Sequence, residues 1–228
     1  MYITYHLHIC FSEEVHMSAI YVRTATYVDM IDVDRLHSVV YYDEGYLPCA
    51  EPPEMTRLVP YADAAYTQVF IACVKDQLGG EQIIGTLSLT KQSAHGFPFF
   101  ADDFSELSAL LSEDGTCCAL LWRFAIERNY RSRGVPMLLF EAAYAASRGR
   151  GITCVVCVVN PDKHAHFYCN KLSFKRISKE QHSCEHTETH VTASGLTNVP
   201  AILLAAPLQG IGDRLAALRK GIIRINLK

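Results

Sequence analysis

The chain has 228 residues, which fits one domain of about 150 to 250 residues and is too short for two enzyme domains with separate cores. Apolar residues make up 50% of the chain and charged residues 20%, which excludes disorder and a fibrous repeat. With 21 Lys and Arg against 24 Asp and Glu, the net charge is −3, which argues against nucleic-acid binding. We expect a single domain over residues 1–228, with an N-terminal extension at 1–19 and a basic C-terminal tail at 209–228.

The apolar runs are all far shorter than the roughly 20 residues of a membrane helix, so no span is expected. No Lys or Arg precedes Arg23 and no continuous apolar segment follows the N-terminus, which argues against a secretory signal and favours the cytoplasm. The nine cysteines form an odd set in a chain with a sufficient core, which indicates that most of them are reduced core residues.

The first half of the chain alternates β-rich runs with amphipathic stretches. We expect strands at 20–23, 69–75 and 83–90, and helices at 28–40 and 104–111. Asp29 is the candidate N-cap of the first helix. The segment 41–60 is rich in Pro and Gly and predicts a surface loop, whereas Gly79-Gly80 favours a hairpin between the second and third strands.

The second half contains nearly unbroken apolar runs, which are typical of strands buried on both faces. We expect strands at 117–126, 152–159, 174–177 and 201–206, and helices at 136–148 and 161–171. This order predicts a mixed sheet with helices packed on it, an α/β (α+β) fold. The basic stretch 214–228 either packs as a helix or frays.

The junction Arg131-Ser132-Arg133-Gly134-Val135-Pro136 lies between a buried strand and the start of the strongest helix. Such a turn presents unpaired backbone N–H groups and the positive end of the helix dipole, and its Gly allows close approach of a phosphate. The alternative is an ordinary solvated turn. In the segment 160–174, Tyr168 is similarly either a functional hydroxyl or a core residue.

Together the two segments resemble the acyl-donor-binding motifs of the GCN5-related N-acetyltransferase (GNAT) superfamily. The matching residues are Arg131 and Gly134 in the first motif and Asn160, Phe167, Tyr168 and Phe174 in the second. Pro136 and Ser173 stand where the superfamily has Gly or Ala and Gly, respectively. The resemblance implies a mixed, mostly antiparallel sheet with flanking helices and a splayed central pair of strands.

A narrower resemblance lies in Asp43-Glu44-Gly45-Tyr46-Leu47-Pro48, Ile84-Gly85-Thr86-Leu87 and Arg123-Phe124-Ala125-Ile126. These segments look like the long-chain N-acyl amino acid synthases and their relatives, the acyl-homoserine lactone synthases. Ser88 and Leu120 stand where the lactone synthases typically carry Arg and Glu, which favours the amino acid synthases. The resemblance implies transfer of a fatty acyl group from acyl carrier protein or acyl-CoA to the amine of a small acceptor.

The resemblance also implies roles for individual residues. Strands 122–127 and 155–160 would bind the donor arm and thioester through backbone groups, including those of Phe124 and Ile126. Arg131, Arg133, Gly134 and Asn160 would complete the binding of acyl-CoA or acyl-phosphopantetheine. Tyr168 would assist the departing thiolate, and Glu127 or Asp43 would accept the amine proton. Trp122, Arg123 and Phe99 are the candidate substrate-binding residues.

Because Pro136 lacks an N–H group, the predicted phosphate cradle is one donor short, which favours the single phosphate of a carrier protein over the pyrophosphate of CoA. Residues 123–150 hold six Arg against two Glu, a local balance of +4. This segment could steer an acidic acyl carrier protein, or it could be an ordinary basic face.

Two other functions stay open. The chain could be a non-catalytic acyl- or protein-binding module with a degenerate acyltransferase fold, or a short-chain N-acetyltransferase that uses acetyl-CoA. His182, His186 and His190 would align for Zn or Ni if they were helical, but the surrounding Ser and Thr favour a loop. We therefore expect no metal site.

Overall fold

The computed structural model describes residues 5–6, 19–46, 66–75, 79–93, 97, 105–179, 182–184 and 199–225. Their strands form one sheet in the order β1-β2-β3-β4-β5-β6-β9-β7, with β8 paired to β9. The strands are β1 (Tyr5–His6), β2 (Tyr21–Thr24), β3 (Thr67–Lys75), β4 (Glu81–Lys91), β5 (Cys118–Ile126), β6 (Cys154–Val159), β7 (Lys175–Arg176), β8 (His182–Cys184) and β9 (Val199–Pro207). Among these strands only β5 and β6 pair in parallel, which confirms the mixed, mostly antiparallel sheet.

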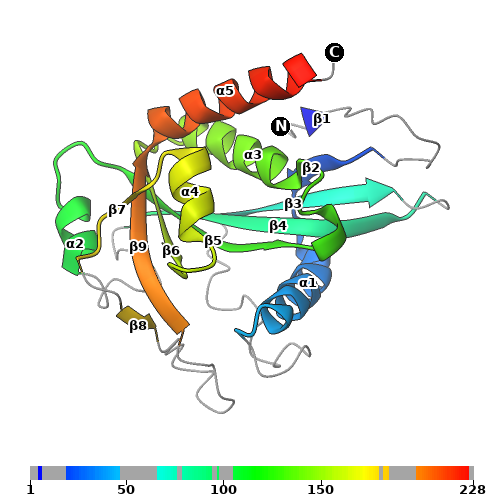
Figure 1. Ribbon diagram of the computed structural model, residues 1–228, viewed down its shortest axis with the longest axis horizontal. Coiled ribbons are helices and arrows are strands. Elements are labelled where there is room, and N and C mark those ends of the chain that lie inside the picture. The colour runs from blue at the N-terminus through cyan, green and yellow to red at the C-terminus, as the bar shows by residue number, and fades with distance from the viewer. Residues whose placement is uncertain are drawn as a thin grey trace.

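Helices cover both faces of this sheet (Figure 1). They are η1 (Tyr27–Asp29), α1 (Met30–Asp43), α2 (Ser105–Leu111), η3 (Arg128–Tyr130), α3 (Val135–Gly149), α4 (Ala165–Leu172) and α5 (Leu208–Ile225). The larger core cluster joins α3, α4 and α5 to one face, where Leu139 and Phe140 are fully buried. On the opposite face Val33 of α1 packs against Ile71 and Cys73 of β3.

Four segments differ from the sequence-based expectation. Helix α1 continues to Asp43, and α4 begins only at Ala165 because the residues before it form a separate turn. Strand β8 lies within the stretch predicted as a loop, and β1 pairs with β2 inside the predicted N-terminal extension. The C-terminal stretch packs as helix α5, since Ile211 and Leu215 join the main core. No helix in the described ranges combines the length and apolar character needed to cross a membrane.

The central strands β5 and β6 pair over only part of their length. Their register runs from Cys118 opposite Cys154 to Leu121 opposite Cys157, and β5 then continues to Ile126 paired with β4 alone. A bulge interrupts the β4–β5 ladder at this point, where Arg123 has a φ of 52°. The predicted splay of the central pair is therefore present, and it begins at the bulge.

Gly85 of β4 sets how closely α3 approaches the sheet. A methyl group added at this position would lie 3.0 Å from Cγ1 of Val135 and 3.2 Å from Cδ1 of Leu139. Glycine therefore lets the first turns of α3 lie directly on the strand that borders the bulge.

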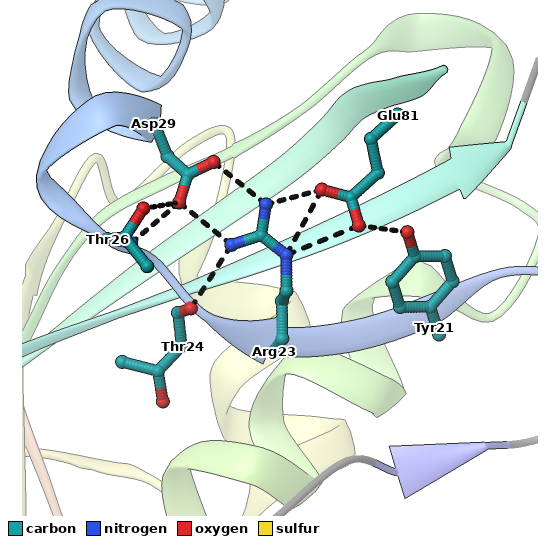
Figure 2. A network of polar contacts seen from close by, with 6 residues as sticks. All are labelled: Tyr21, Arg23, Thr24, Thr26, Asp29 and Glu81. Atoms are coloured by element: carbon teal, nitrogen blue, oxygen red, sulfur yellow. Dashed lines mark hydrogen bonds and ion pairs between the residues drawn. The ribbon is translucent and has the colours of Figure 1, made fainter. Parts of the chain in front are cut away.

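A network of polar side chains fixes the start of α1 (Figure 2). The guanidinium of Arg23 donates to both oxygens of Asp29, at 2.8 Å each, and is also ion-paired with Glu81. Asp29 accepts from the backbone N–H of Thr26 at 2.6 Å, so its carboxylate closes the turn before the helix rather than capping α1 itself. The hydrogen bond from Arg23 lowers the pKa of Asp29 far below its usual range.

Candidate active site

The splay places three successive residues of β5 in different surroundings. Trp122 donates its indole N–H to Oγ1 of Thr90 at 2.8 Å, and Phe124 joins the core on the α3 face. Arg123, at the bulge between them, is buried and ion-paired with Asp34 of α1, with its guanidinium 5.8 Å from the Trp122 ring. The side chain of Arg123, predicted to bind substrate, therefore ties the strained backbone of the bulge to α1.

An aromatic cluster lies on the α3 and α4 side of the splay. The ring of Phe124 is 5.3 Å from Phe140, 6.2 Å from Phe167 and 6.4 Å from Tyr168, measured between centroids. The first and third contacts are edge-to-face, an arrangement that aromatic pairs favour. This cluster brings together β5, α3 and α4, which are separate in sequence.

Tyr168, the predicted proton donor, lies inside this cluster and also contacts Phe174 at 5.4 Å between ring centroids. Burial raises its pKa well above the usual value, which makes its hydroxyl a poor acid. We therefore predict that Tyr168 only donates a hydrogen bond to the leaving sulfur.

The predicted phosphate cradle has the backbone form that its sequence suggested. Gly134 adopts a φ of 77° and directly precedes α3, which begins at Val135 with Pro136 in its first turn. Within the described ranges, no acceptor is recorded for the backbone N–H groups of Gly134, Val135 and Met137. The turn therefore carries three backbone donors and the positive end of the α3 dipole, the features that its predicted role in phosphate binding requires.

The two arginines of the cradle, Arg131 and Arg133, have different partners. Arg133 is exposed, with its guanidinium 5.2 Å from the centre of the Tyr130 ring. Arg131 donates through Nε to the carbonyl oxygen of Ile126 at 3.2 Å and through Nη1 to Glu44 at 2.7 Å. Of the two, Arg133 is thus the one whose charge is available to a phosphate.

Asn160 ends β6 and organises the turn before α4. Its side-chain oxygen Oδ1 accepts the backbone N–H groups of Asp162 at 2.9 Å and Lys163 at 3.0 Å. Its backbone carbonyl oxygen accepts the backbone N–H of His164 at 3.0 Å. The side chain predicted to bind the donor is therefore used to fix this turn.

Neither of the two carboxylates predicted as bases is hydrogen-bonded to this turn within the described residues. Glu127 follows β5 and accepts a hydrogen bond from Gln82 at 3.3 Å, while Asp43 is exposed at the end of α1. The neighbouring Glu44 instead pairs with Arg131 and lies 3.9 Å from Lys163. Burial acts to raise the pKa of Glu44, but the hydrogen bond and charge of Arg131 outweigh it and lower the pKa.

Sequence reasoning also missed the pair formed by Tyr46 and His164. The hydroxyl of Tyr46 lies 2.9 Å from Nε2 of His164, and the ammonium of Lys163 lies 4.8 Å from the centre of the Tyr46 ring. Tyr46 belongs to the quoted segment 43–48, which was the one available signal, whereas nothing local singled out His164.

Phe99, His186 and His190 lie outside the described residues. Over the ranges that the structure describes, no group of three potential metal ligands is found.

A bulged and splayed central strand pair beside a glycine-led helix is the architecture of a GNAT acyltransferase. Residues 32–197 match the family model of the N-acyl amino acid synthase FeeM. The chain therefore belongs to the FeeM family of N-acyl amino acid synthases and is an acyltransferase.

Solved structures show the same fold. FeeM from uncultured soil microbes aligns with a TM-score of 0.64 and 20% identity, over 85% of this chain and 93% of FeeM. The GNAT domain of PAT from S. lividans gives a TM-score of 0.50 at 16% identity, over 83% and 90% of the two chains. The Salmonella typhimurium protein yncA, named as a candidate acetyltransferase and solved with acetyl-CoA, gives a TM-score of 0.53 at 10% identity. The alignment covers 83% of this chain and 94% of yncA. The sequence matches no curated protein.

Proposed function

We propose that this protein transfers a long-chain fatty acyl group from a phosphopantetheine thioester to the amine of an amino acid. The observation that supports this most is the part of β5 beyond Leu121, which pairs with β4 but no longer with β6 and lies next to a helix start with unbonded N–H groups. A pantetheine arm could pair with the strand while its phosphate binds at the helix start.

The reaction forms a C–N bond and breaks a C–S bond. The amine nitrogen attacks the thioester carbon, whose oxygen carries the negative charge until the thiolate leaves. Backbone N–H groups near the bulge would stabilise that oxyanion, and one such donor is typically worth about 3 to 4 kcal/mol. The bulge at Arg123 is relevant because it redirects the backbone of β5 where the strands part.

Two features support acyl carrier protein as the donor. Pro136 removes one N–H group from the first turn of α3, which suits a single phosphate better than a pyrophosphate. Of the six arginines in 123–150, Arg123 and Arg131 are engaged in ion pairs, but Arg128, Arg133 and Arg148 are exposed. Arg133 lies beside the helix start, where it would meet the acidic surface of a carrier protein. A protein that takes its acyl group from either donor would act in the cytoplasm, and we propose that location for this protein.

The experiment compares acyl carrier protein and CoA as carriers of the same acyl chains, from acetyl to palmitoyl, with pooled amino acids as acceptors. Mass spectrometry should detect N-acyl amino acids, with long chains and the carrier-protein donor preferred. Arg133→Glu should raise KM for the carrier protein more than for acyl-CoA, whereas the matched control Arg148→Glu at the far end of α3 should alter KM less.

Several outcomes would overturn parts of this proposal. Equal turnover with both donors and an unaffected Arg133→Glu variant would exclude the carrier-protein preference. Product from acetyl-CoA alone would identify a short-chain N-acetyltransferase. Tight donor binding without any product would identify a non-catalytic module.

A further inference from the structure

The turn after β6 holds His164 firmly at the open end of the splay. Its backbone N–H donates to the backbone carbonyl oxygen of Asn160, which also accepts the N–H of Ala165 at 3.3 Å. The side chain of Asn160 in turn accepts the backbone N–H groups of Asp162 and Lys163, the two residues before His164. The pairing of β6 with β5 has already ended at Cys157. His164 therefore occupies a defined position shortly after the part of β6 that is not paired with β5.

The imidazole of His164 is fixed from the other side of the splay by the end of α1. Tyr46, three residues after α1 ends, approaches Nε2 at 2.9 Å, with the two ring centroids 6.0 Å apart. The backbone N–H of Tyr46 donates to the carbonyl oxygen of Tyr41 at 2.8 Å, and these two rings meet edge-to-face at 5.6 Å. Tyr41, Tyr46 and His164 thus form a row of side chains that runs from α1 to the turn after β6.

The surroundings of this row keep the imidazole neutral. Burial is the largest influence and lowers the pKa of His164, the cations Lys163 and Arg131 lower it further, and the carboxylate of Glu44 opposes them. Burial also raises the pKa of Tyr46 to about 12, so its hydroxyl stays protonated near neutral pH. A neutral imidazole beside a protonated tyrosine is suited to accepting a proton through that hydroxyl.

We propose that His164, acting through Tyr46, is the base that removes the proton from the acceptor amine. This inference rests on the proposed N-acyl transfer. Once the amine nitrogen has bonded to the thioester carbon, its proton passes to the Tyr46 oxygen as the Tyr46 proton passes to Nε2 of His164. When the C–S bond breaks, the sulfur keeps the electron pair and the proton returns through Tyr46 to the sulfur. The products are an amide and a thiol, so the proton balance is closed.

This assignment differs from the sequence-based choice of Glu127 or Asp43. Neither carboxylate has a recorded hydrogen bond to a histidine or tyrosine within the described residues, and Asp43 is exposed at the helix end. His164 has a partner in hydrogen-bond contact from a second element, as an oriented base requires.

The test uses His164→Gln, which keeps a side chain able to bond Tyr46 but cannot be protonated. Its matched control is His166→Gln, which alters an exposed histidine two residues further along. The measurement is kcat/KM against pH from about 5 to 9, with the donor and acceptor that the wild type uses best. We expect the wild-type rate to fall at acidic pH with an apparent pKa below 6.5. His164→Gln should lose roughly 100-fold and no longer show that acidic limb.

Further measurements separate catalysis from structure. Tyr46→Phe should also lower kcat/KM while leaving donor binding unchanged in a thermal-shift titration with CoA. Added imidazole should partly restore a His164→Ala variant, which it would not do for a residue that only supports the turn. A His164→Gln enzyme with wild-type rate and pH profile would overturn this inference alone. Absence of any product from the wild type would overturn the proposed function and this inference together.

Discussion

The two halves of the β5–β6 pair are stabilised by different interactions. In the closed half, Cys118–Leu121 of β5 pairs residue by residue with β6, and its side chains are buried and apolar. In the open half, Arg123 lies at a bulge and combines a positive φ angle with a buried ion pair. The closed half follows from apolar patterning alone, whereas the open half is held in place by α1. The geometry of the open half therefore depends on a helix that lies outside the strand pair.

The largest expected effect on stability comes from breaking the ion pair between Arg123 and Asp34, which holds the open half in place. Asp34→Ala leaves the buried guanidinium of Arg123 without its carboxylate, and breaking such a pair typically costs about 3 to 5 kcal/mol. Urea unfolding should show this loss, with activity falling further in molecules that remain folded. The control is Asp32→Ala, which removes the exposed pair with Arg35 and should change stability by less than about 1 kcal/mol. Equal effects of the two substitutions would contradict a special role for the buried pair.

A smaller effect on stability is expected from substituting Gly85, which lets α3 lie close to the open half. Gly85→Ala adds a methyl group against Val135 and Leu139, and overpacking of this kind costs about 1 to 3 kcal/mol. Because Val135 begins α3, the substitution should also weaken donor binding at Gly134, measured by titration with CoA. Gly149→Ala at the other end of α3 meets no atom within 4 Å and should be close to neutral. A neutral Gly85→Ala would show that α3 can move without cost.

The smallest effect concerns the anchor at the start of α1, which lies away from the splay. The pKa of Asp29 is lowered in the folded protein, so its stabilisation is present above about pH 4 and is lost as the pH falls through the folded-state value. Arg23→Gln should remove this contribution, at most about 1 kcal/mol for a partly exposed pair. Thermal unfolding at neutral and acidic pH should show the two proteins converging at low pH. A difference that persists at low pH would assign the effect to packing of the Arg23 side chain.

Periodicity predicted most of the elements because hydrophobic pattern is a local property. The hairpin β3–β4, the buried strands β5 and β6, and helix α3 all lie within a few residues of their expected bounds. The splay was expected from a family resemblance rather than from the pattern, since β5 is apolar, apart from Arg123, both where it pairs with β6 and beyond that point.

The side chains around the splay were less predictable because their partners are distant in sequence. Tyr46 and His164 are 118 residues apart, and Arg123 meets Asp34 across 89 residues. Asp43 and Glu44 are chemically alike neighbours, and only the geometry of the helix end directs Glu44 toward Arg131. Tyr168 matched a motif, but its sequence could not show that four aromatic rings surround it.

The position of β9 has a consequence for synthesis of the chain. Val155 in β6 pairs with Ala206 in β9, and β9 separates β6 from β7. The strand that borders the splay therefore gains its second neighbour only after β9, about 40 residues further along the chain, has been synthesised. Until then β6 has an exposed edge that can pair with other chains. Any fragment that stops before residue 199 would carry every element of the splay and yet be prone to aggregate.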